Sequence, residues 1–455
     1  MSKRIFNHGT HDFISDLPDP ILHVIISHLT IDEVLRTSIL SKRWTHLWKN
    51  VSHFDFDCTR MVNLEKIDSS GKKRVIKIDV MIYDNMVNHI LHQHQGNLIS
   101  GCFKHFRHKN GFGDLKTSVE FLIERKKISS LSLECVSLNR RSIITKDCFK
   151  AKIFSNLSSL ELTNYKLEDS VLSAFESCER LKILKLKNMF MVDTTINGIL
   201  QNCYGLEKFS LVESKGFNSI KIENKSLKTL ELFRLNVRNI HVRVEELQIL
   251  VIDSIICPPK DLRIYSENIR TFCSAYNPFD QRTQLHYRQR NKILKTQDIL
   301  ENCSDLFKSR SINIFRKLLT LSIDLDLNNI REVLALSYVL MSCGLLQTLK
   351  ITIPANEASA SNITTNDDDC ALPYVKSMFW ETREMYYFDF FEKLKFVTLK
   401  GFTGKEQEVI FARLLIARAY MMEKMYVICD STIVDEAKDL LSLPRSSSRL
   451  AIILE

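Results

Sequence analysis

The chain has 455 residues, of which 45% are hydrophobic and 26% are charged, and its formal net charge is +9. This composition supports ample core, which excludes an intrinsically disordered chain, and the length allows one long solenoid or two to three compact domains. No stretch is long enough to span a bilayer, and residues 1–8 lack the apolar run of a secretory signal. We therefore expect a cytoplasmic or nuclear location, or both, and no membrane partner.

The twelve cysteines and the basic charge balance predict neither a metal site nor nucleic-acid binding. The cysteines are scattered and form no Cys-x-x-Cys pair, which favours reduced, buried side chains over structural zinc. The lysines and arginines occur in twos and threes among acidic residues, without an RNA-binding or zinc-finger signature. We expect no cofactor, no metal ion and no nucleic-acid partner.

Three short helices are predicted within residues 12–58. Asp19 can cap a helix that continues through Pro20, and Thr30 has the spacing to Glu33 of a capping box for a second helix. A module of this size has a marginal core. Because Val24 lies off the apolar stripe of the first helix, that helix is apolar on more than one side, and a partner could cover the excess.

Short motifs run through this segment in a specific order: Leu17-Pro18, Ile21-Leu22, Arg36-Thr37-Ser38, Leu40-Ser41-Lys42-Arg43-Trp44 and Leu47-Trp48. They resemble an F-box of the large plant family of F-box proteins with leucine-rich repeats. The resemblance implies binding to a Skp-family adaptor and, through it, to cullin and RING subunits. The implied adaptor-binding residues are Leu17, Pro18, Ile21, Leu22, Ile25, Val34, Leu35, Ser38, Leu40, Trp44 and Trp48. The alternative is a plain helical subdomain whose tryptophans are core.

Residues 59–127 are predicted to bridge the helices to a repeat region and to cap its N-terminal end. Helices are expected at 84–94 and 115–125, with an extended segment at 98–106. Phe54 and Phe56 alternate with acidic residues, which predicts a strand that joins this cap and couples the two modules rigidly. The bridge also holds a cluster of possible metal ligands, namely His89, His92, His94, Cys102, His105 and His108. Their spacing matches no zinc motif, so we interpret them as incidental.

The middle of the chain repeats the pattern apolar-x-x-apolar-x-apolar. Copies begin at Ile128, Leu157, Leu181, Leu206, Leu227, Leu247, Ile269, Leu318, Leu346 and Leu394. From the second to the seventh, the starts are 24, 25, 21, 20 and 22 residues apart, which is the period of leucine-rich repeats. Each copy predicts a short strand followed by a return segment. Residues 170–177 and 194–202 suit helical returns, and the shorter units suit loops or extended segments.

Outward-facing residues of these strands are the expected contacts for a target protein. They are Glu161, Thr163, Lys185, Lys187, Lys208, Ser210, Glu231, Phe233, Val251 and Asp253. Lys185, Lys187 and Lys208 could form a basic patch for an acidic or phosphorylated target. A merely solvated strand face is the alternative for any one of them. Cys178, Cys203 and Cys343 each precede a strand leucine by three residues, a position that predicts small buried side chains.

The C-terminal part changes character. Residues 355–389 are predicted to be a loop and linker, and residues 390–455 are similar to the FBD region that closes many of the plant proteins. The expected elements are strands at 394–399, 424–429 and 450–454 and helices at 405–420 and 433–441. We expect this α+β unit to cap the apolar end of the repeats at 128–354.

The predicted fold class is therefore α/β, with an N-terminal three-helix F-box, a leucine-rich-repeat solenoid and an α+β C-terminal cap. No catalytic motif is present, and we expect a non-catalytic chain. The resemblance implies the substrate-recognition subunit of an SCF-type cullin–RING E3 ubiquitin ligase, with an unknown protein as substrate. Two alternatives stay open: an adaptor-binding scaffold outside a ligase, and a small-molecule-responsive receptor that uses the concave face of the repeats.

Overall fold

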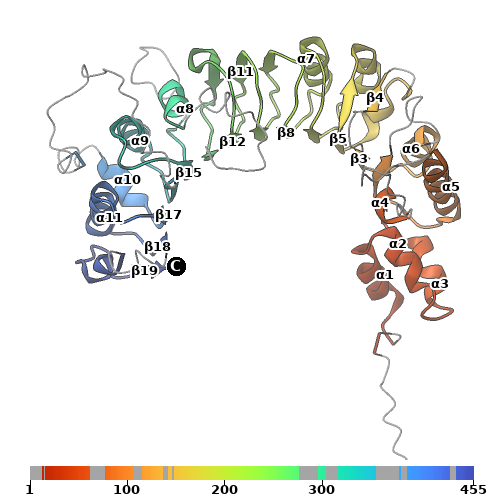
Figure 1. Ribbon diagram of the computed structural model, residues 1–455, viewed down its shortest axis with the longest axis horizontal. Helices are drawn as coiled ribbons and strands as arrows, with labels where there is room; N and C mark the ends of the chain where they lie inside the picture. Colours follow the sequence, from red (N-terminus) through yellow and green to blue (C-terminus); the bar gives the residue numbers. More distant parts are fainter. Residues whose placement is uncertain are drawn as a thin grey trace, which may run out of the picture. The chain divides into compact units, whose positions relative to one another are not determined.

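The computed structural model describes residues 13–14, 16–61, 77–106, 115–136, 142–145, 148–275, 296–303, 315–354, 379–380, 387–430 and 437–455. The chain divides into two compact units, Met1–Leu181 and Lys182–Glu455. Both units are built from parallel strands connected by helices or extended returns (Figure 1). Most of the predicted loop and linker at 355–389 lies outside the described residues, as does His108.

The first unit opens with three short helices, as the sequence predicts. They are α1 (Asp19–Ser27), α2 (Ile31–Thr37) and α3 (Trp44–Leu47), followed by the 3-10 turn η1 (Trp48–Asn50). The predicted capping box is present, because Glu33 accepts a hydrogen bond from the backbone N–H of Thr30 at 3.1 Å. Asp19 does not cap α1, whose N-cap residue is Pro18. The Asp19 carboxylate instead accepts a hydrogen bond from Arg43 Nε at 2.7 Å, which connects α1 to the start of α3.

The rest of the first unit alternates strands with helices. Its elements are β1 (His53–Asp57), α4 (Cys58–Met61), α5 (Lys77–Gln93), β2 (Ser100–Phe106), α6 (Leu115–Glu124), β3 (Ser130–Val136), β4 (Ser142–Ile144), η2 (Ile153–Asn156), β5 (Ser159–Thr163), β6 (Tyr165–Leu167) and η3 (Asp169–Phe175). Strands β1, β2, β3 and β5 are parallel neighbours in that order, and β4 pairs with β6. The helices expected at 84–94 and 115–125 and the strand expected at 98–106 are confirmed, although α5 begins earlier.

Strand β1 is the predicted link between the helices and the sheet. Phe54 and Phe56 point into the core, and the Phe56 ring stacks on Phe103 of β2 with 5.1 Å between centroids. Asp55 and Asp57 lie on the opposite face, as the period of two requires. The alternation of the sequence therefore places this strand correctly and makes it part of the repeat sheet.

Backbone contacts hold the end of the helical segment against the loop before β2. The carbonyl of Lys49 accepts hydrogen bonds from the N–H groups of Gln95 and Gly96 at 2.8 and 3.0 Å. A Cβ at Gly96 would lie 2.8 Å from Cα of Asn50, so only glycine allows this approach. His94 is buried beside it and donates from Nε2 to the Val51 carbonyl at 2.8 Å.

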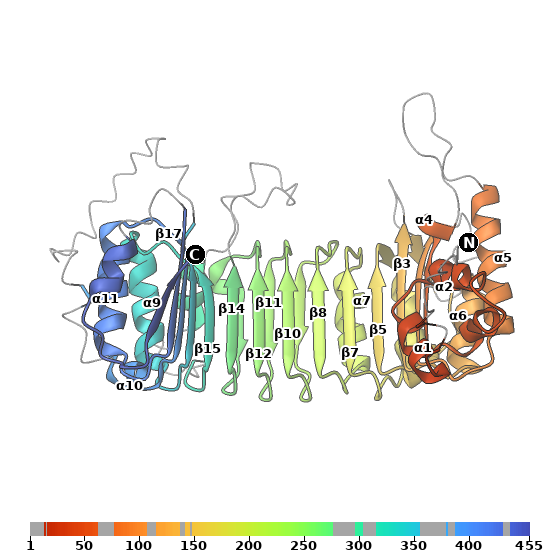
Figure 2. The same ribbon diagram turned by 90° about the horizontal axis from the view of Figure 1, so that it is seen from below.

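The second unit continues the pattern of parallel strands (Figure 2). Its elements are β7 (Ile183–Lys187), α7 (Asp193–Asn202), β8 (Lys208–Val212), β9 (Ser219–Ile222), β10 (Thr229–Phe233), β11 (Asn239–Arg243), β12 (Ile249–Asp253), η4 (Pro259–Asp261), β13 (Leu262–Tyr265), β14 (Thr271–Ala275), α8 (Thr296–Cys303), β15 (Thr320–Asp324), α9 (Ile330–Ser342), β16 (Thr348–Thr352), α10 (Phe388–Lys393), β17 (Phe396–Phe402), α11 (Glu406–Arg418), β18 (Lys424–Cys429), η11 (Asp439–Ser442) and β19 (Ala451–Leu454). Strands β7, β8, β10, β12, β14, β15, β16, β17, β18 and β19 are neighbours in that order.

A left-handed residue follows several of these strands and turns the chain toward its return segment. Asn188, Glu213, Arg234 and Ser254 all have φ between 49° and 52° and directly follow β7, β8, β10 and β12. A left-handed conformation costs a non-glycine residue about 1 kcal/mol. The N–H groups of Asn188, Glu213 and Arg234 each donate to the carbonyl of the last residue of the neighbouring strand in the sheet, at 2.8 or 2.9 Å. These hydrogen bonds offset the cost.

The return segments differ in the way that their lengths predict. The shorter units return through β9, β11 and β13, which form a second parallel sheet of three strands. The predicted helical return at 194–202 is α7, whereas that at 170–177 is the 3-10 helix η3 rather than an α-helix. Cys178, Cys203 and Cys343 are fully buried, which confirms them as core residues.

The C-terminal elements agree with the prediction where the structure describes them. Strands β17, β18 and β19 and helix α11 occur at the expected positions. In the described part of the helix expected at 433–441, residues 437–438 are α-helical and η11 follows them. Gly401 has φ +76°, and a Cβ there would lie 2.5 Å from the Ile353 carbonyl oxygen. This glycine creates the irregular pairing between β17 and β18 just before α11.

We expect the stability of the first unit to fall as the pH drops below 6.5. Burial lowers the pKa of His94 below its usual 6.5, so the fold holds the neutral imidazole while the unfolded chain takes up a proton. The His94→Gln variant keeps a donor but does not titrate. Its melting temperature should fall less between pH 7 and pH 5 than that of the wild type, which loses up to about 1.4 kcal/mol per pH unit through His94. Equal decreases in melting temperature between pH 7 and pH 5 for the two proteins would contradict the assignment of this effect to His94.

Candidate functional site

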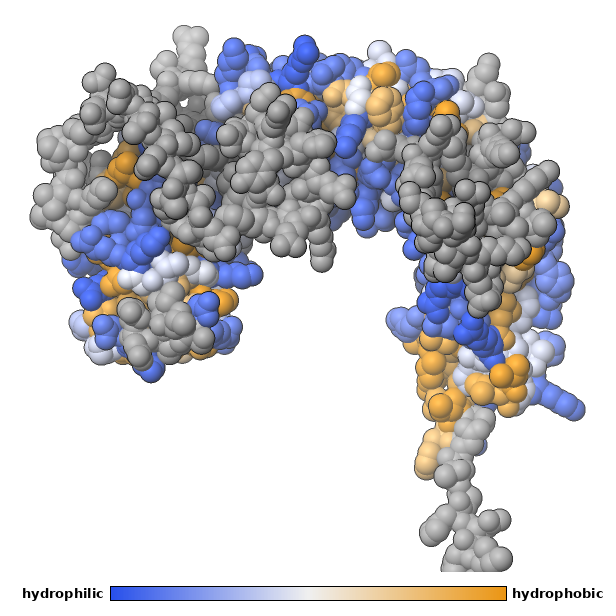
Figure 3. All heavy atoms as spheres, in the orientation of Figure 1, coloured by the Kyte–Doolittle hydropathy of each residue, from blue (hydrophilic) through white to orange (hydrophobic). Residues whose placement is uncertain are grey.

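The helices α1 to α3 present apolar side chains to solvent. Ile21, Val24 and Ile25 of α1 are 46%, 59% and 40% exposed, and Ile39 and Leu40 after α2 are 86% and 64% exposed. We call these five residues the helical apolar surface. Figure 3 shows the hydrophobic colour concentrated over these helices. Exposed apolar side chains that gather on one small module typically mark an interaction site.

The residues predicted to bind an adaptor divide by exposure. Pro18, Ile21, Ile25 and Leu40 are exposed; Leu17, Leu35 and Ser38 are partly exposed; Leu22, Val34, Trp44 and Trp48 are buried. The side chains of the last four pack inside the helical module, which for Trp44 and Trp48 agrees with the core role that the sequence also allowed, and the adaptor contacts stay predictions. The helix period explains the split, since Leu22 and Ile26 face the core while Ile21 and Ile25 face outward.

Val24 and Ile39 belong to the helical apolar surface but are not among the predicted contacts. Val24 lies off the main stripe of α1, which is a signal that the sequence contains. Ile39 lies in the turn between α2 and α3, where helical periodicity does not predict which way a side chain points. Both side chains are more exposed than Ile21 and Ile25.

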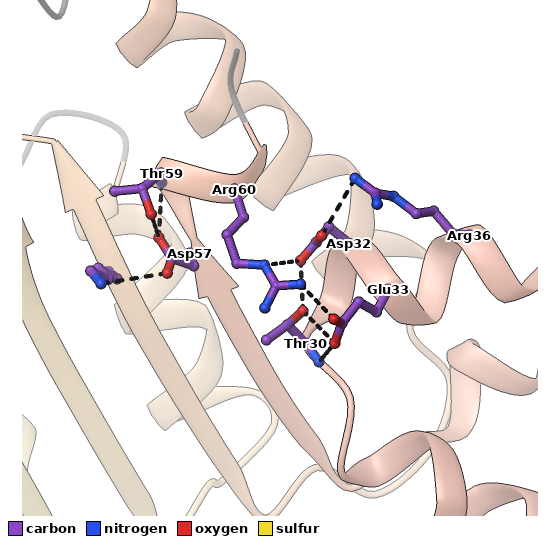
Figure 4. Close-up of polar contacts among 8 residues, drawn as sticks. Thr30, Asp32, Glu33, Arg36, Asp57, Thr59 and Arg60 are labelled. Carbon is purple, nitrogen blue, oxygen red and sulfur yellow. Dashed lines mark hydrogen bonds and ion pairs between the residues drawn. The ribbon is translucent and has the colours of Figure 1, made fainter. Parts of the chain in front are cut away.

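An ionic cluster joins α2 to the end of β1 (Figure 4). Arg60 of α4 places Nη2 2.5 Å from Glu33 Oε1 and Nε 3.4 Å from Asp32 Oδ1. Asp32 also accepts a hydrogen bond from the Thr30 hydroxyl at 2.7 Å. The Arg60 hydrogen bond, with help from Thr30, lowers the pKa of Glu33 from 4.5 to about 2. Side chains therefore hold the helical segment to α4 at the end of β1, while the Lys49 carbonyl holds it to the loop before β2.

Charged side chains on the strands of the second unit and directly beside the strand ends form ion pairs. Lys208 Nζ lies 2.5 Å from Glu231 Oε1, Lys228 Nζ lies 2.9 Å from Glu207 Oε2, and Arg234 Nη1 lies 2.6 Å from Glu213 Oε1. These pairs connect residues of neighbouring repeats. Lys208 pairs with Glu231, Lys185 and Lys187 are exposed, and the basic patch stays a prediction.

The predicted target contacts also divide by exposure. Lys185 and Lys187 are exposed; Glu161, Lys208, Glu231, Phe233, Val251 and Asp253 are partly exposed; Thr163 and Ser210 are buried. Ser210 lies in register between Lys185 and Glu231, whose longer side chains can cover its short one. Thr163 and Ser210 lie on the predicted face but are buried, and target contact by the whole set stays a prediction.

The histidines of the bridge have separate partners. His105 bonds through Nδ1 to the Phe106 carbonyl and through Nε2 to the Tyr165 hydroxyl, and His94 bonds to Val51. His89 bonds to Gln93, and the His92 ring packs near Phe121. Across the described residues, no three side chains of the metal-binding types come together.

Comparisons with known proteins bear on the helical module and on the repeats separately. Residues 14–56 match the model of the F-box domain, and residues 121–250 match the model described as "FBD-associated F-box protein At5g56370, LRR repeats". The chain therefore contains an F-box domain followed by leucine-rich repeats similar to those of plant F-box proteins. Neither matched model describes an enzyme family.

Relatives of this F-box protein come from Arabidopsis thaliana. The F-box protein At1g80960 is 27% identical, over 91% of this chain and 83% of that protein. F-box/LRR-repeat protein 25 is 29% identical, over 50% of this chain and 76% of that protein. The F-box/FBD/LRR-repeat protein At1g13570 is 28% identical, over 38% of this chain and 44% of that protein.

A solved structure, an internalin from Listeria monocytogenes, is 10% identical with a TM-score of 0.26, covering 74% of this chain and 88% of its own.

In the part of the F-box protein that the structure describes, no helix is both long and apolar enough to cross a membrane.

Removing Arg60 should raise the pKa of Glu33 toward 4.5 and weaken the attachment of the F-box to β1. In the wild type, this carboxylate stabilises the fold above about pH 4.5, and that contribution is lost as the pH falls toward 2. We expect Arg60→Ala to lower the melting temperature at pH 7 and to move the Glu33 titration followed by carbon-13 NMR.

The matched control is Arg36→Ala. Arg36 lies 3.8 Å from Asp32, and its side chain is 75% exposed, so its loss should leave the Glu33 titration nearly unchanged. If the two variants shift the Glu33 pKa equally, the cluster has been assigned wrongly.

Proposed function

We propose that this protein is the substrate-recognition subunit of an SCF-type cullin–RING E3 ubiquitin ligase. In this proposal the F-box binds a Skp-family adaptor, and the repeats bind a protein target. The chain itself carries out no chemistry. It raises the effective concentration of target lysines near a ubiquitin-charged enzyme bound to other subunits.

The helical apolar surface is the observation that carries the proposal. Ile21, Val24, Ile25, Ile39 and Leu40 remain exposed while Leu22, Val34, Trp44 and Trp48 fill the interior of the same helices. The module is thus folded around its own core and still has apolar side chains to bury. Burying an aliphatic side chain of this size is worth about 1.5–3 kcal/mol. Such a surface suits a protein partner, and the match of residues 14–56 to the F-box domain supports a Skp-type adaptor in that role.

The attachment of the F-box to the first strands supports a presenting role. Arg60 binds Asp32 and Glu33 of α2, and the Lys49 carbonyl accepts two N–H groups from the loop before β2. These contacts limit the motion of the F-box relative to the first strands, which suits a module that holds its partner in a defined orientation. We propose that the exposed Lys185 and Lys187 contribute to target binding on the strand face.

Replacing Ile21 with aspartate should strongly weaken adaptor binding. Ile21 is 46% exposed in the first turn of α1, where an acidic residue is compatible with the helix, so the fold should tolerate the change. A desolvated interface residue of this kind contributes about 2 kcal/mol or more, which corresponds to a dissociation constant raised about 30-fold. Calorimetric titration of a purified Skp-family adaptor measures the effect.

The control is Ile330→Asp, because Ile330 is also 46% exposed at the start of a helix, α9, but lies in the second unit. It should leave adaptor affinity unchanged. Equal affinities for wild type and Ile21→Asp, with both proteins folded by circular dichroism, would refute the assigned surface.

A reconstituted assay distinguishes a ligase receptor from a scaffold. The proposal expects the adaptor-bound protein to recruit cullin and RING subunits and to promote ubiquitination of proteins that co-purify with it under proteasome inhibition. Adaptor binding without cullin recruitment would instead indicate a scaffold. The double variant Lys185→Glu/Lys187→Glu should reduce ubiquitination without changing adaptor binding.

A further inference from the structure

The extended return segments of the second unit form a sheet that has an outward face of its own. Strands β9, β11 and β13 are parallel neighbours, and Figure 1 shows β11 in a layer separate from that of β12. The apolar side chains of these strands, such as Ile240 and Val242, are fully buried, and the alternate side chains face outward. Because the strands are in register at a spacing of about 4.8 Å, they hold the outward side chains in a regular and stiff arrangement.

Four outward side chains of β11 and β13 form a compact basic group. His241 of β11 is in register with Arg263 of β13, and two residues further along Arg243 is in register with Tyr265. The two arginines therefore lie on a diagonal, about 8 Å apart at Cα. The rings of His241 and Tyr265, on the other diagonal, have centroids 5.5 Å apart. We call these four residues the return-sheet block; its arginines and Tyr265 are exposed, and His241 is partly exposed.

The two arginines of the block have no anionic partner in the described part of the chain. Neither guanidinium group forms a hydrogen bond or an ion pair there, and this includes Asp261, which precedes β13. On the neighbouring strand, Lys221 Nζ lies 2.8 Å from Glu223 Oε2. This bond is the main cause that lowers the pKa of Glu223, and the charges of His241 and Arg243 add to the effect. Since Lys221 already neutralises Glu223, the block keeps a positive charge that an anion from outside can balance.

A phosphate monoester suits this arrangement better than a carboxylate does. It carries a charge of about −1.5 to −2 and three terminal oxygens, and the guanidinium fork of arginine binds phosphate through paired N–H donors. A carboxylate has two oxygens, which one arginine fork satisfies, so it would leave the second arginine without a ligand. The Tyr265 hydroxyl and a His241 ring N–H supply two further donors beside the arginines.

The shape of the site favours a phosphate carried by a protein over a free metabolite. Pockets for small molecules are concave and enclose most of the ligand, whereas Arg243 and Arg263 lie on the exposed face of a sheet. A protein segment that lies across this face would supply the remaining contacts. An open face also lets the backbone of that segment come close to the sheet, which the short side chain of phosphoserine or phosphothreonine requires.

We propose that the return-sheet block binds a phosphorylated serine or threonine of a partner protein. Arg243 and Arg263 bind the phosphate oxygens, and Tyr265 and His241 donate further hydrogen bonds to them. The site lies on the outward face of the return sheet and not on the strand face where target binding is proposed, so it does not depend on the ligase role. Phosphorylation of the partner switches this contact on, because an uncharged hydroxyl offers two arginines no anion to bind.

Fluorescence anisotropy of the full chain, with a labelled degenerate peptide library that has phosphoserine at its centre, tests the proposal. The same library with serine at the centre should bind at least about tenfold more weakly. Arg243→Gln and Arg263→Gln should each weaken binding of the phosphoserine library about tenfold. Arg263→Lys keeps the charge but loses the fork, and should weaken it about threefold. The melting temperatures should not change, since both arginines are exposed and have no partner among the described residues.

The matched control is Arg270→Gln, which removes another exposed arginine of the second unit, in the turn before β14, and should leave phosphoserine binding unchanged. Equal binding of the two libraries, or full binding by the double variant Arg243→Gln/Arg263→Gln, overturns the proposal. Inorganic phosphate that competes at the concentration of the phosphoserine peptides overturns it in favour of a free anion. A single-stranded DNA oligonucleotide that binds more tightly than the phosphoserine library overturns it in favour of a nucleic acid.

Discussion

The unshifted register between neighbouring parallel strands is the constraint on which each unit depends. Leu230 of β10 aligns with Phe209 of β8 and Leu250 of β12, so every strand buries the same alternate positions as its neighbours. A slip of one residue would turn Leu230 and Leu232 to solvent and bring Glu231 into the core. Each exposed leucine would cost about 1.5–3 kcal/mol. The repeated leucine spacing and the left-handed residues after the strands both serve to maintain this register.

The helical module depends on the same ladder at its junction. Strand β1 directly follows the module and is in register with β2, and Gly96 allows the loop before β2 to approach Asn50 closely. The module therefore gains rigidity from the sheet without giving up its apolar side chains to it. The junction with the sheet is thus fixed, and the helical apolar surface stays uncovered. This arrangement suits the adaptor binding that we propose.

Periodicity predicts the parts of the structure that local sequence controls. The strands, the capping box at Thr30 and the extended or helical returns follow from spacing, and the motif order predicts the F-box. Sequence could not predict the pairing of Lys208 with Glu231, because that bond depends on how adjacent repeats align. Nor could it predict the binding of Arg60 to Asp32 and Glu33, or the burial of Ser210, since both depend on residues distant in sequence.

The mixture of return segments in the second unit has a mechanical consequence. The extended returns β9, β11 and β13 stack at the strand spacing of about 4.8 Å, which equals that of the strands in front. The axes of packed helices typically lie about 8–10 Å apart, so helical returns such as α9 and α11 occupy more width behind the sheet than extended returns do. Local curvature therefore depends on whether a return is helical or extended. Replacing an extended return by a helical one would bend the strand face without altering a single residue on it.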